Sequence, residues 1–288
     1  MKLFPHTNRR YLDALADHVV VFDGAMGTSV QTCNLGPIDF GGETLNGCND
    51  YLVITRPDVV ESIHASFLAV GAEAIETDTF RSNRLTMREY GLQDRIIEIN
   101  CAAAALARRV ADRFERETGV PRFVAGSIGP SGMLPSTNDP TLSNISFQEL
   151  VDVFREQSVG LIQGGADLLL IETQQDILET KAAVHGAWRA FEETGIRIPV
   201  QAHTGSHGQG VSRSDNLCSQ CAEDGSPLER AQSGETSSLV VRAQREAAPL
   251  HAERSSPSPS GVHHPSLEWA KPQRPVPWSH FFPFPCRL

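Results

Sequence analysis

The hydrophobic positions of residues 1–202 follow two alternating patterns. Short continuous apolar runs are followed by stretches in which apolar residues recur every three or four positions. The first pattern is typical of buried strands and the second of amphipathic helices. The runs that predict strands are residues 19–22, 74–75, 123–126, 168–171 and 198–201, and the periodic stretches that predict helices are residues 59–70, 93–117, 146–163 and 176–193.

This strand–helix alternation predicts a parallel sheet whose faces are covered by helices. We expect an α/β fold of the (β/α)8 TIM-barrel type, of which the chain supplies the N-terminal five β-strands and four helices only. A doubly wound sheet is the alternative, because it is built from the same units. The loop after the first strand lacks a G-x-G-x-x-G fingerprint, which favours the barrel. Residues 24–54 and 131–144 show little periodicity and predict long loops.

The alternation stops near Ala202. Residues 203–288 hold ten of the eighteen prolines, and segments such as residues 255–260 contain only Ser and Pro. Segments of this kind bury too little apolar surface to offset chain entropy. We therefore expect a partial barrel domain over residues 1–202 and a largely disordered tail over residues 203–288, whose composition fits translation out of frame. The strand-like run of the tail is residues 237–241.

Charge and composition exclude several classes of protein. The tail carries eight basic and eight acidic side chains, so the whole net charge of −10 lies on residues 1–202. An acidic body argues against nucleic-acid binding, which requires clustered Lys and Arg. The sequence has no apolar run of about 18 residues, no apolar stretch typical of a signal peptide, and six scattered cysteines. We expect a cytoplasmic protein without a membrane span or disulfide framework.

Acidic side chains follow three of the predicted strands. Asp23 precedes two nearby glycines, Glu76 lies close to Thr79, and Glu172 ends the fourth apolar run. Parallel barrels place their active sites at the carboxyl ends of their strands. Three carboxylates in one mouth suit a substrate with a positive group, such as an amino acid, and a glycine-containing loop can bring free N–H groups to a carboxylate. Tight turns and helix caps would explain each motif separately.

Five motifs in these positions carry a resemblance to a known family. They are Asp23-Gly-Ala-Met-Gly-Thr28, Gly47-Cys-Asn-Asp50, Gly71 to Phe80, Ala125 to Pro130, and Gly164 to Thr173. Over about residues 10–202 the chain resembles the homocysteine S-methyltransferase family, and most of all the N-terminal homocysteine-binding module of cobalamin-dependent methionine synthase. Asp78 departs from the pattern, because the family usually has Asn there.

The resemblance implies a barrel enzyme that transfers a methyl group to the thiol of homocysteine and gives methionine. The methyl donor would be methyltetrahydrofolate, betaine or a methylsulfonium compound, and the chain contains no cobalamin module. The resemblance also implies the substrate contacts. They are Asp23, Gly24, Met26, Gly27, Glu172 and Thr173, with Glu76 and Thr79 as further candidates.

The family uses zinc to convert the substrate thiol to a thiolate. Its ligands are three cysteines, one in an Asn-Cys motif after a later strand and two in a Gly-Gly-Cys-Cys-Gly motif. The sequence contains neither motif in that place. A set of His203, His207, Cys218 and Cys221 lacks the surrounding strand or helix pattern that would fix ligand geometry. We therefore expect no metal ligands and no catalytic residues, and an inactive or impaired enzyme.

Two further expectations follow. A non-catalytic fragment and an amino-acid-binding protein are the alternatives to a methyltransferase. In a five-stranded part of a barrel, the first and the fifth strand would both be open edges, which invite pairing with another chain. We expect self-association through those edges.

Overall fold

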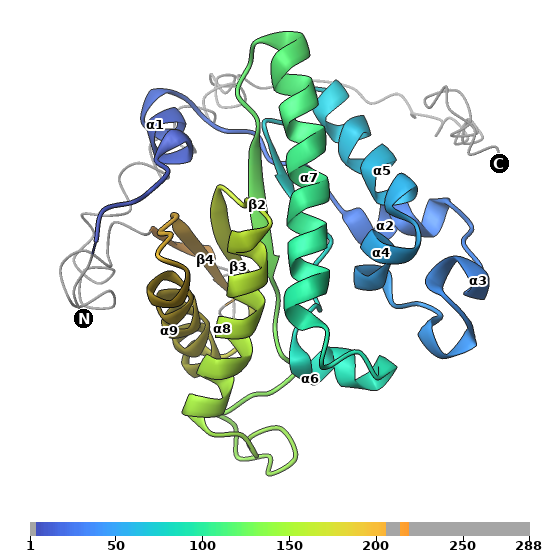
Figure 1. The fold of residues 1–288 in the computed structure, drawn as a ribbon. Coiled ribbons are helices and arrows are strands. Elements are labelled where there is room, and N and C mark those ends of the chain that lie inside the picture. Colours follow the sequence, from blue (N-terminus) through green and yellow to red (C-terminus); the bar gives the residue numbers. More distant parts are fainter. Residues whose placement is uncertain (1–3, 206–213, 219–288) are drawn as a thin grey trace, which may run out of the picture. The chain divides into compact units, whose positions relative to one another are not determined.

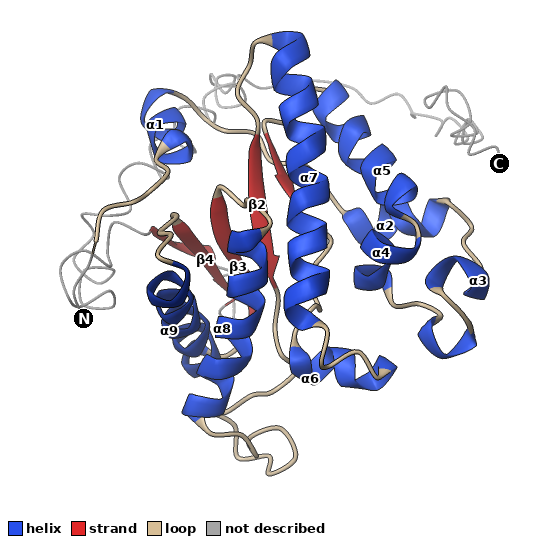
Figure 2. Cartoon of the chain, in the orientation of Figure 1, coloured by secondary structure: helices blue, strands red, loops and turns tan. Residues whose placement is uncertain are grey.

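The computed structural model describes residues 4–205 and 214–218, all within one compact unit of residues 1–243. A five-stranded sheet lies at its centre, with the strands in sequence order (Figures 1 and 2). The first four strands are parallel and the fifth is antiparallel to its neighbour. The strands are β1 (Ala74–Glu76), β2 (Phe123–Ile128), β3 (Leu168–Gln174), β4 (Val200–Gly205) and β5 (Ser214–Cys218).

The four predicted helices are confirmed, and each of them comes before a strand of the sheet along the chain. They are α5 (Pro57–Ala69), α7 (Ile96–Thr118), α8 (Phe147–Gln163) and α9 (Ile177–Thr194). The capping box predicted at Ser146 is present: Ser146 Oγ accepts from Glu149 N at 3.2 Å, and Glu149 Oε2 accepts from Ser146 N at 2.8 Å. The chain leaves α7 and α9 through Gly119 and Gly195, whose φ angles are 71° and 68°.

The region predicted as a loop over residues 24–54 is mostly short helices, so that prediction was wrong. Elements of three to seven residues are too short to show helical periodicity in the sequence. Residues outside the four long helices form α1 (Arg10–Asp17), α2 (Met26–Thr32), α3 (Pro37–Phe40), α4 (Leu52–Thr55) and α6 (Arg84–Met87), and the 3₁₀ turns η1 (Glu43–Leu45), η2 (Asn49–Tyr51) and η3 (Arg88–Tyr90).

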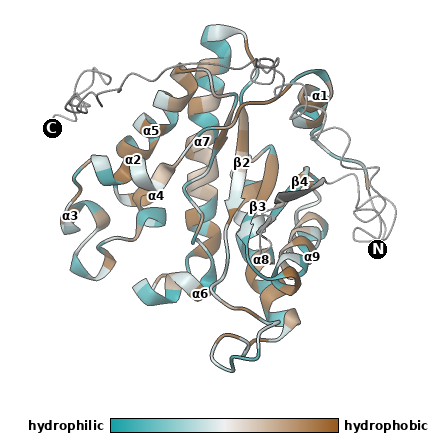
Figure 3. Cartoon of the chain, turned by 180° about the vertical axis from the view of Figure 1, so that it is seen from behind, coloured by the Kyte–Doolittle hydropathy of each residue, from teal (hydrophilic) through white to brown (hydrophobic). Residues whose placement is uncertain are grey.

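The two faces of the sheet pack against different elements. Successive side chains of a strand point to opposite faces. On the outer face, Ile75, Val124, Leu169 and Ile171 join one apolar cluster with α5, α7, α8 and α9. In Figure 1, α7 and α8 lie in front of β2 and β3, and Figure 3 shows the same part of the chain from behind. The inner face carries a second cluster, formed by Ala74, Phe123, Ala125, Leu168 and Leu170 with Tyr11 of α1 and Val20.

Glycines permit the close helix contacts of the outer layer. A Cβ on Gly160 of α8 would lie 2.7 Å from the carbonyl oxygen of Ile97, on α7. A Cβ on Gly186 of α9 would lie 2.7 Å from the backbone nitrogen of Arg155, on α8. Both distances are far below an ordinary van der Waals contact, so the three helices can pack this closely only because these positions lack side chains.

The edges of the sheet differ from the prediction. Residues 19–22 do not form a strand, and only Phe22 makes an isolated parallel bridge, to Ala74. Within the described residues this segment pairs on one side only, and Val19 and Val21 remain more than half exposed. The predicted strand over residues 198–201 is β4, displaced toward the C-terminus, and β5 pairs with it. The strand predicted as the fifth, which is β4, is therefore not an open edge, because β5 pairs with it. The run at residues 237–241 lies outside the described residues.

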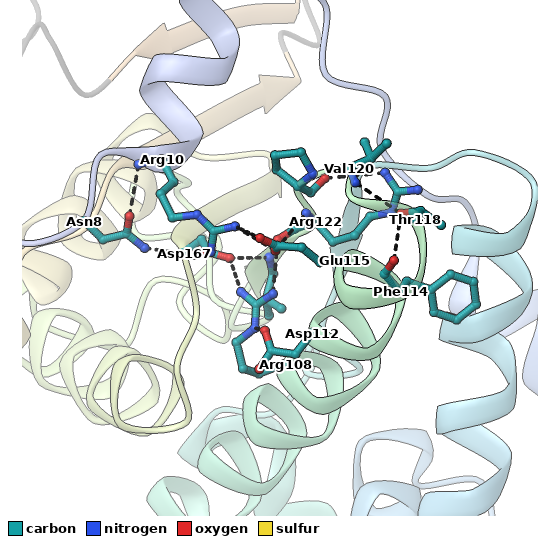
Figure 4. Close-up of polar contacts among 12 residues, drawn as sticks. Asn8, Arg10, Arg108, Asp112, Phe114, Glu115, Thr118, Val120, Arg122 and Asp167 are labelled. Atoms are coloured by element: carbon teal, nitrogen blue, oxygen red, sulfur yellow. Dashed lines mark hydrogen bonds and ion pairs between the residues drawn. The ribbon is translucent and has the colours of Figure 1, made fainter.

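A buried acid ties the N-terminal segment to the helix layer (Figure 4). Asp167 is 3% exposed and lies directly before β3. Its Oδ1 accepts from Asn8 Nδ2 at 2.8 Å, and its Oδ2 accepts from Arg108 Nη1 at 2.5 Å and from Val124 N at 2.9 Å. Arg10 adds a second tie, with Nη2 donating to both carboxylate oxygens of Glu115 on α7 at 2.7 Å. These contacts hold the segment that leads into α1, so α1 stays against the inner face.

None of the helices in the described ranges is both long and apolar enough to cross a membrane.

Asp167→Ala should lower the free energy of unfolding by about 3–5 kcal/mol, because it leaves Arg108 and the Val124 N–H without their buried acceptor. Urea denaturation followed by circular dichroism measures the change. Asp94→Ala is the matched control, since its carboxylate is 78% exposed and pairs with Arg84 at 3.3 Å, so the expected loss is below about 1 kcal/mol. Equal effects of the two substitutions would contradict this role of Asp167.

Candidate functional site

The inner face of the sheet becomes polar toward the carboxyl ends of its strands. On this face Glu76 follows Ala74 in β1, Ser127 follows Ala125 in β2, and Glu172 follows Leu170 in β3. The register pairs Glu76 with Ala125 and Ser127 with Leu170, so the polar side chains come at or beyond the last apolar layer. The polar side chains of these three strands therefore lie on one face, at the carboxyl ends of the strands.

Asp23 joins this group from the segment beside β1. Its Oδ1 and Oδ2 both accept from the backbone N–H of Glu76, each at 3.1 Å. Burial raises the pKa of Asp23 to about 7, against the opposing effect of that backbone hydrogen bond, and the charge of Glu172 raises it further. This hydrogen bond holds Asp23 against β1, the strand that carries Glu76.

The pKa values of Glu76 and Glu172 are raised as well. Burial raises the pKa of Glu76 to about 8, and the charges of Glu172 and Asp23 add to the effect. Burial also raises the pKa of Glu172, although Ser127 Oγ donates to its Oε1 at 2.5 Å and so stabilises the ionised form. Burial thus disfavours the ionised form of all three carboxyls, and the charge of Glu172 adds repulsion at Asp23 and Glu76. The arrangement favours a ligand that brings an ammonium group.

The glycine-containing loop lies at the start of α2. Gly24 packs tightly, because a Cβ there would lie 3.2 Å from Phe67 Cε1. Gly27 is in the first turn, where a Cβ would come within 3.8 Å of Asn49 Nδ2, and Met26 packs partly buried against the outer core. Ala25, the residue before α2, offers no side-chain cap to the first backbone N–H groups. The loop thus combines close packing with N–H groups that no side chain caps.

The two threonines among the candidates lie in different surroundings. Thr173 is exposed and has a φ of 58°, an unusual conformation for a β-branched residue. It lies where the pairing of β3 with β4 shifts, between Ile171 and Gln174. Thr79 is fully buried, its Oγ1 donating to the Ser127 carbonyl at 2.8 Å and lying 2.6 Å from Thr77 Oγ1. Thr79 therefore links two strand ends, whereas Thr173 is open to a ligand.

A second acidic pair lies beside a small cavity that the sequence did not indicate. The cavity has a volume of about 130 Å³, and its lining includes Cys48, Asp50 and Arg81. Asp50 Oδ1 accepts from Arg81 N at 2.8 Å. Asp78 is 7% exposed, and its Oδ2 has no hydrogen-bond partner in the described part of the chain. Burial and the charge of Asp50 raise the pKa of Asp78 well above its ordinary value. This shift favours the neutral form of Asp78, at the position where the resemblance leads us to expect a neutral Asn.

The cysteines with described side chains do not fit a zinc–thiolate site. Cys33 follows α2, Cys101 lies on α7, and Cys48 is buried, with its Sγ 3.9 Å from the sulfur of Met87. Burial, with a further contribution from Asp50, raises the pKa of Cys48 to about 12, which opposes the thiolate that zinc needs. Among the described residues, no three His, Cys, Asp or Glu side chains form a group able to hold a metal ion. The side chains of His207, Cys218 and Cys221 are outside the described residues.

Sequence reasoning missed Ser127, although it lies in one of the recognised motifs. Its position could have indicated this role, because Ser127 lies two residues after Ala125 and therefore on the same face of the sheet, which also carries Glu172. It also assigned no role to Gln201, whose Oε1 accepts from Tyr11 Oη at 2.7 Å on the same face.

Comparison with known proteins identifies the family of the chain. The family model for homocysteine S-methyltransferase matches residues 20–250. Methionine synthase of Mycobacterium tuberculosis is 45% identical over 195 residues, and that of Mycobacterium leprae is 42% identical over 192 residues. Each match covers 67% of this chain but only 15% of the relative, so the chain spans a small part of those proteins.

Solved structures show the same fold. The homocysteine methyltransferase MmuM from Escherichia coli in its metallated form gives a TM-score of 0.54 at 19% identity, over 82% of this chain and 74% of that chain. Its oxidized form gives the same TM-score at 20% identity, over 81% of this chain and 74% of that chain. The α/β architecture of the barrel type is therefore shown. With a family model that matches most of its length, the chain belongs to the homocysteine S-methyltransferase family.

Proposed function

We propose that residues 1–202 form a homocysteine-binding module. The observation that carries the proposal is the crowding of Asp23, Glu76 and Glu172, three half-buried carboxyls on one sheet face. The ammonium group of homocysteine would relieve their repulsion, because an opposite charge favours the ionised carboxylates. The N–H groups around Gly24, Met26 and Gly27 would bind the carboxylate, and Thr173 would lie beside it.

The chemical step requires more than binding. Methyl transfer needs the homocysteine sulfur as a thiolate, which attacks the methyl group while the donor leaves with the bonding electron pair. The family generates that thiolate on zinc, and the described cysteines do not fit such a site. We therefore propose that this chain binds homocysteine and transfers methyl groups poorly or not at all. Methyltetrahydrofolate, betaine and methylsulfonium donors remain the candidate co-substrates, and the cytoplasm the proposed location.

Glu172→Gln should weaken homocysteine binding by about tenfold to a hundredfold, since it removes a charged hydrogen-bond acceptor worth about 1.5–3 kcal/mol. Isothermal titration calorimetry of the full chain measures the dissociation constant. Glu192→Gln is the control, because Glu192 is an exposed acid on α9 away from the mouth. A Glu172→Gln variant that binds homocysteine like the wild type would contradict the proposed site.

The free energy of unfolding should fall as pH rises from about 5 to 8. Asp23 and Glu76 have folded-state pKa values of about 7 and 8 against ordinary values of 3.8 and 4.5. The folded chain therefore holds protons in this range that the unfolded chain has released, which makes stability decrease with pH. Urea denaturation at several pH values measures the slope. Glu76→Gln should flatten it, and a slope unchanged by that substitution would count against the crowded carboxyls.

The purified full chain should contain well below one zinc ion per molecule, because the described residues supply no group of sulfur ligands. Inductively coupled plasma mass spectrometry after dialysis against zinc-containing and zinc-free buffers gives the stoichiometry. One zinc per chain that survives dialysis would show that residues outside the described ranges complete a metal site, and would overturn the proposal of impaired transfer.

A further inference from the structure

The inner face of β4 carries two polar side chains that the proposed site has not used. Gln201 and His203 are separated by one residue and therefore lie on the same face, while Ala202 between them belongs to the outer core. The register pairs Gln201 with Leu170 and Ala202 with Ile171. His203 thus comes one residue beyond the last regular pair of β4, as Glu172 does on β3. Both residues therefore follow the last regular pair of adjacent strands, where the register shifts between Ile171 and Gln174.

A chain of hydrogen bonds orients the His203 ring. Tyr11 Oη donates to Gln201 Oε1 at 2.7 Å, which turns the amide nitrogen of Gln201 toward His203. That nitrogen lies 3.0 Å from His203 Nε2. An amide NH₂ can only donate, so Nε2 is the acceptor and the ring proton is on Nδ1. In the described part of the chain, Nδ1 makes no hydrogen bond.

The surroundings of His203 keep the ring neutral. Burial lowers the pKa of His203, and the hydrogen bond from Gln201 also requires an unprotonated Nε2. A neutral N–H donor adds no charge to a mouth that already holds three acids. It can therefore bind an anionic oxygen without competing with the ligand's ammonium group for Glu172.

We infer that His203 is a further residue of the amino-acid site and donates its Nδ1–H to the carboxylate of the ligand that Glu172 holds by its ammonium group. The inference rests on the proposed function. Neighbouring strands are about 4.8 Å apart, and the ammonium and carboxylate groups of an α-amino acid sit on one carbon atom, so one ligand can bridge the two side chains. The second carboxylate oxygen remains for the loop around Gly24 to Gly27.

Three substitutions separate this role from a structural one. The amide nitrogen of Asn can take the place of Nδ1, whereas the longer Gln reaches the position of Nε2. His203→Asn should keep homocysteine binding within about threefold of the wild type. His203→Gln and His203→Ala should each weaken it about tenfold, the loss expected for one hydrogen bond to a charged group. Isothermal titration calorimetry on the full chain measures all four dissociation constants, and circular dichroism checks that each variant is folded.

The position of the ring proton gives a second readout that needs no ligand. In ¹⁵N-histidine-labelled protein, the His203 Nδ1 should show the chemical shift of a protonated nitrogen at neutral pH, and Nε2 that of an unprotonated one. His203→Ala identifies the signal. A proton on Nε2 would overturn the inference, as would a Gln variant that binds as tightly as the wild type or an Asn variant as weak as the Ala variant.

The outcomes also separate this inference from the proposed function. If the wild type binds homocysteine and all three His203 variants bind it equally well, the contact from His203 is wrong and the site stands. If neither the wild type nor the Glu172→Gln variant binds homocysteine, the proposed function fails, and the contact from His203 fails with it.

Discussion

The burial of three neighbouring carboxyls at one end of the sheet is the constraint on which the rest of the account depends. Each group is pushed toward its neutral form chiefly by burial, and Glu172 raises the pKa values of both Asp23 and Glu76. Such an arrangement costs stability in the empty protein. A positively charged ligand would offset this cost, because an opposite charge favours the ionised carboxylates.

The fold supplies the conditions for this crowding. The outer face is closed by four long helices, and the inner face is closed at its other end by α1, whose Tyr11 packs on Phe123 with ring centroids 5.7 Å apart. Asp167 and Arg10 hold the chain that leads into α1. In the described residues, the carboxyl ends of the strands carry polar side chains at or beyond the last apolar layer, and these side chains are half-buried or buried. The same geometry places His203 of β4 at the end of the sheet that carries Glu172.

Much of the fold could be predicted from the sequence, because the long helices and central strands have strong periodicity. The first strand could not, since an apolar run such as residues 19–22 forms a strand only when partners are present, and here Phe22 alone is bridged. The short helices before α5 are too brief to leave a pattern. At the site, the acids could be predicted because they lie at strand ends. The hydrogen bonds from Thr79 to the Ser127 carbonyl and from Ser127 to Glu172 could not, because they join residues that are far apart in the sequence. The pairing of β5 with β4 lay in a tail whose composition gave no sign of it.

The pKa of the Glu76 carboxyl tests this account most directly. Carbon-13 NMR of glutamate-labelled protein, with Glu76→Gln used to assign the signal, follows its titration in the absence of ligand. The account predicts a midpoint near 8 that moves to lower pH when homocysteine is added. A midpoint near the ordinary value of 4.5, unchanged by homocysteine, would contradict the crowding of acids and the ligand site built on it.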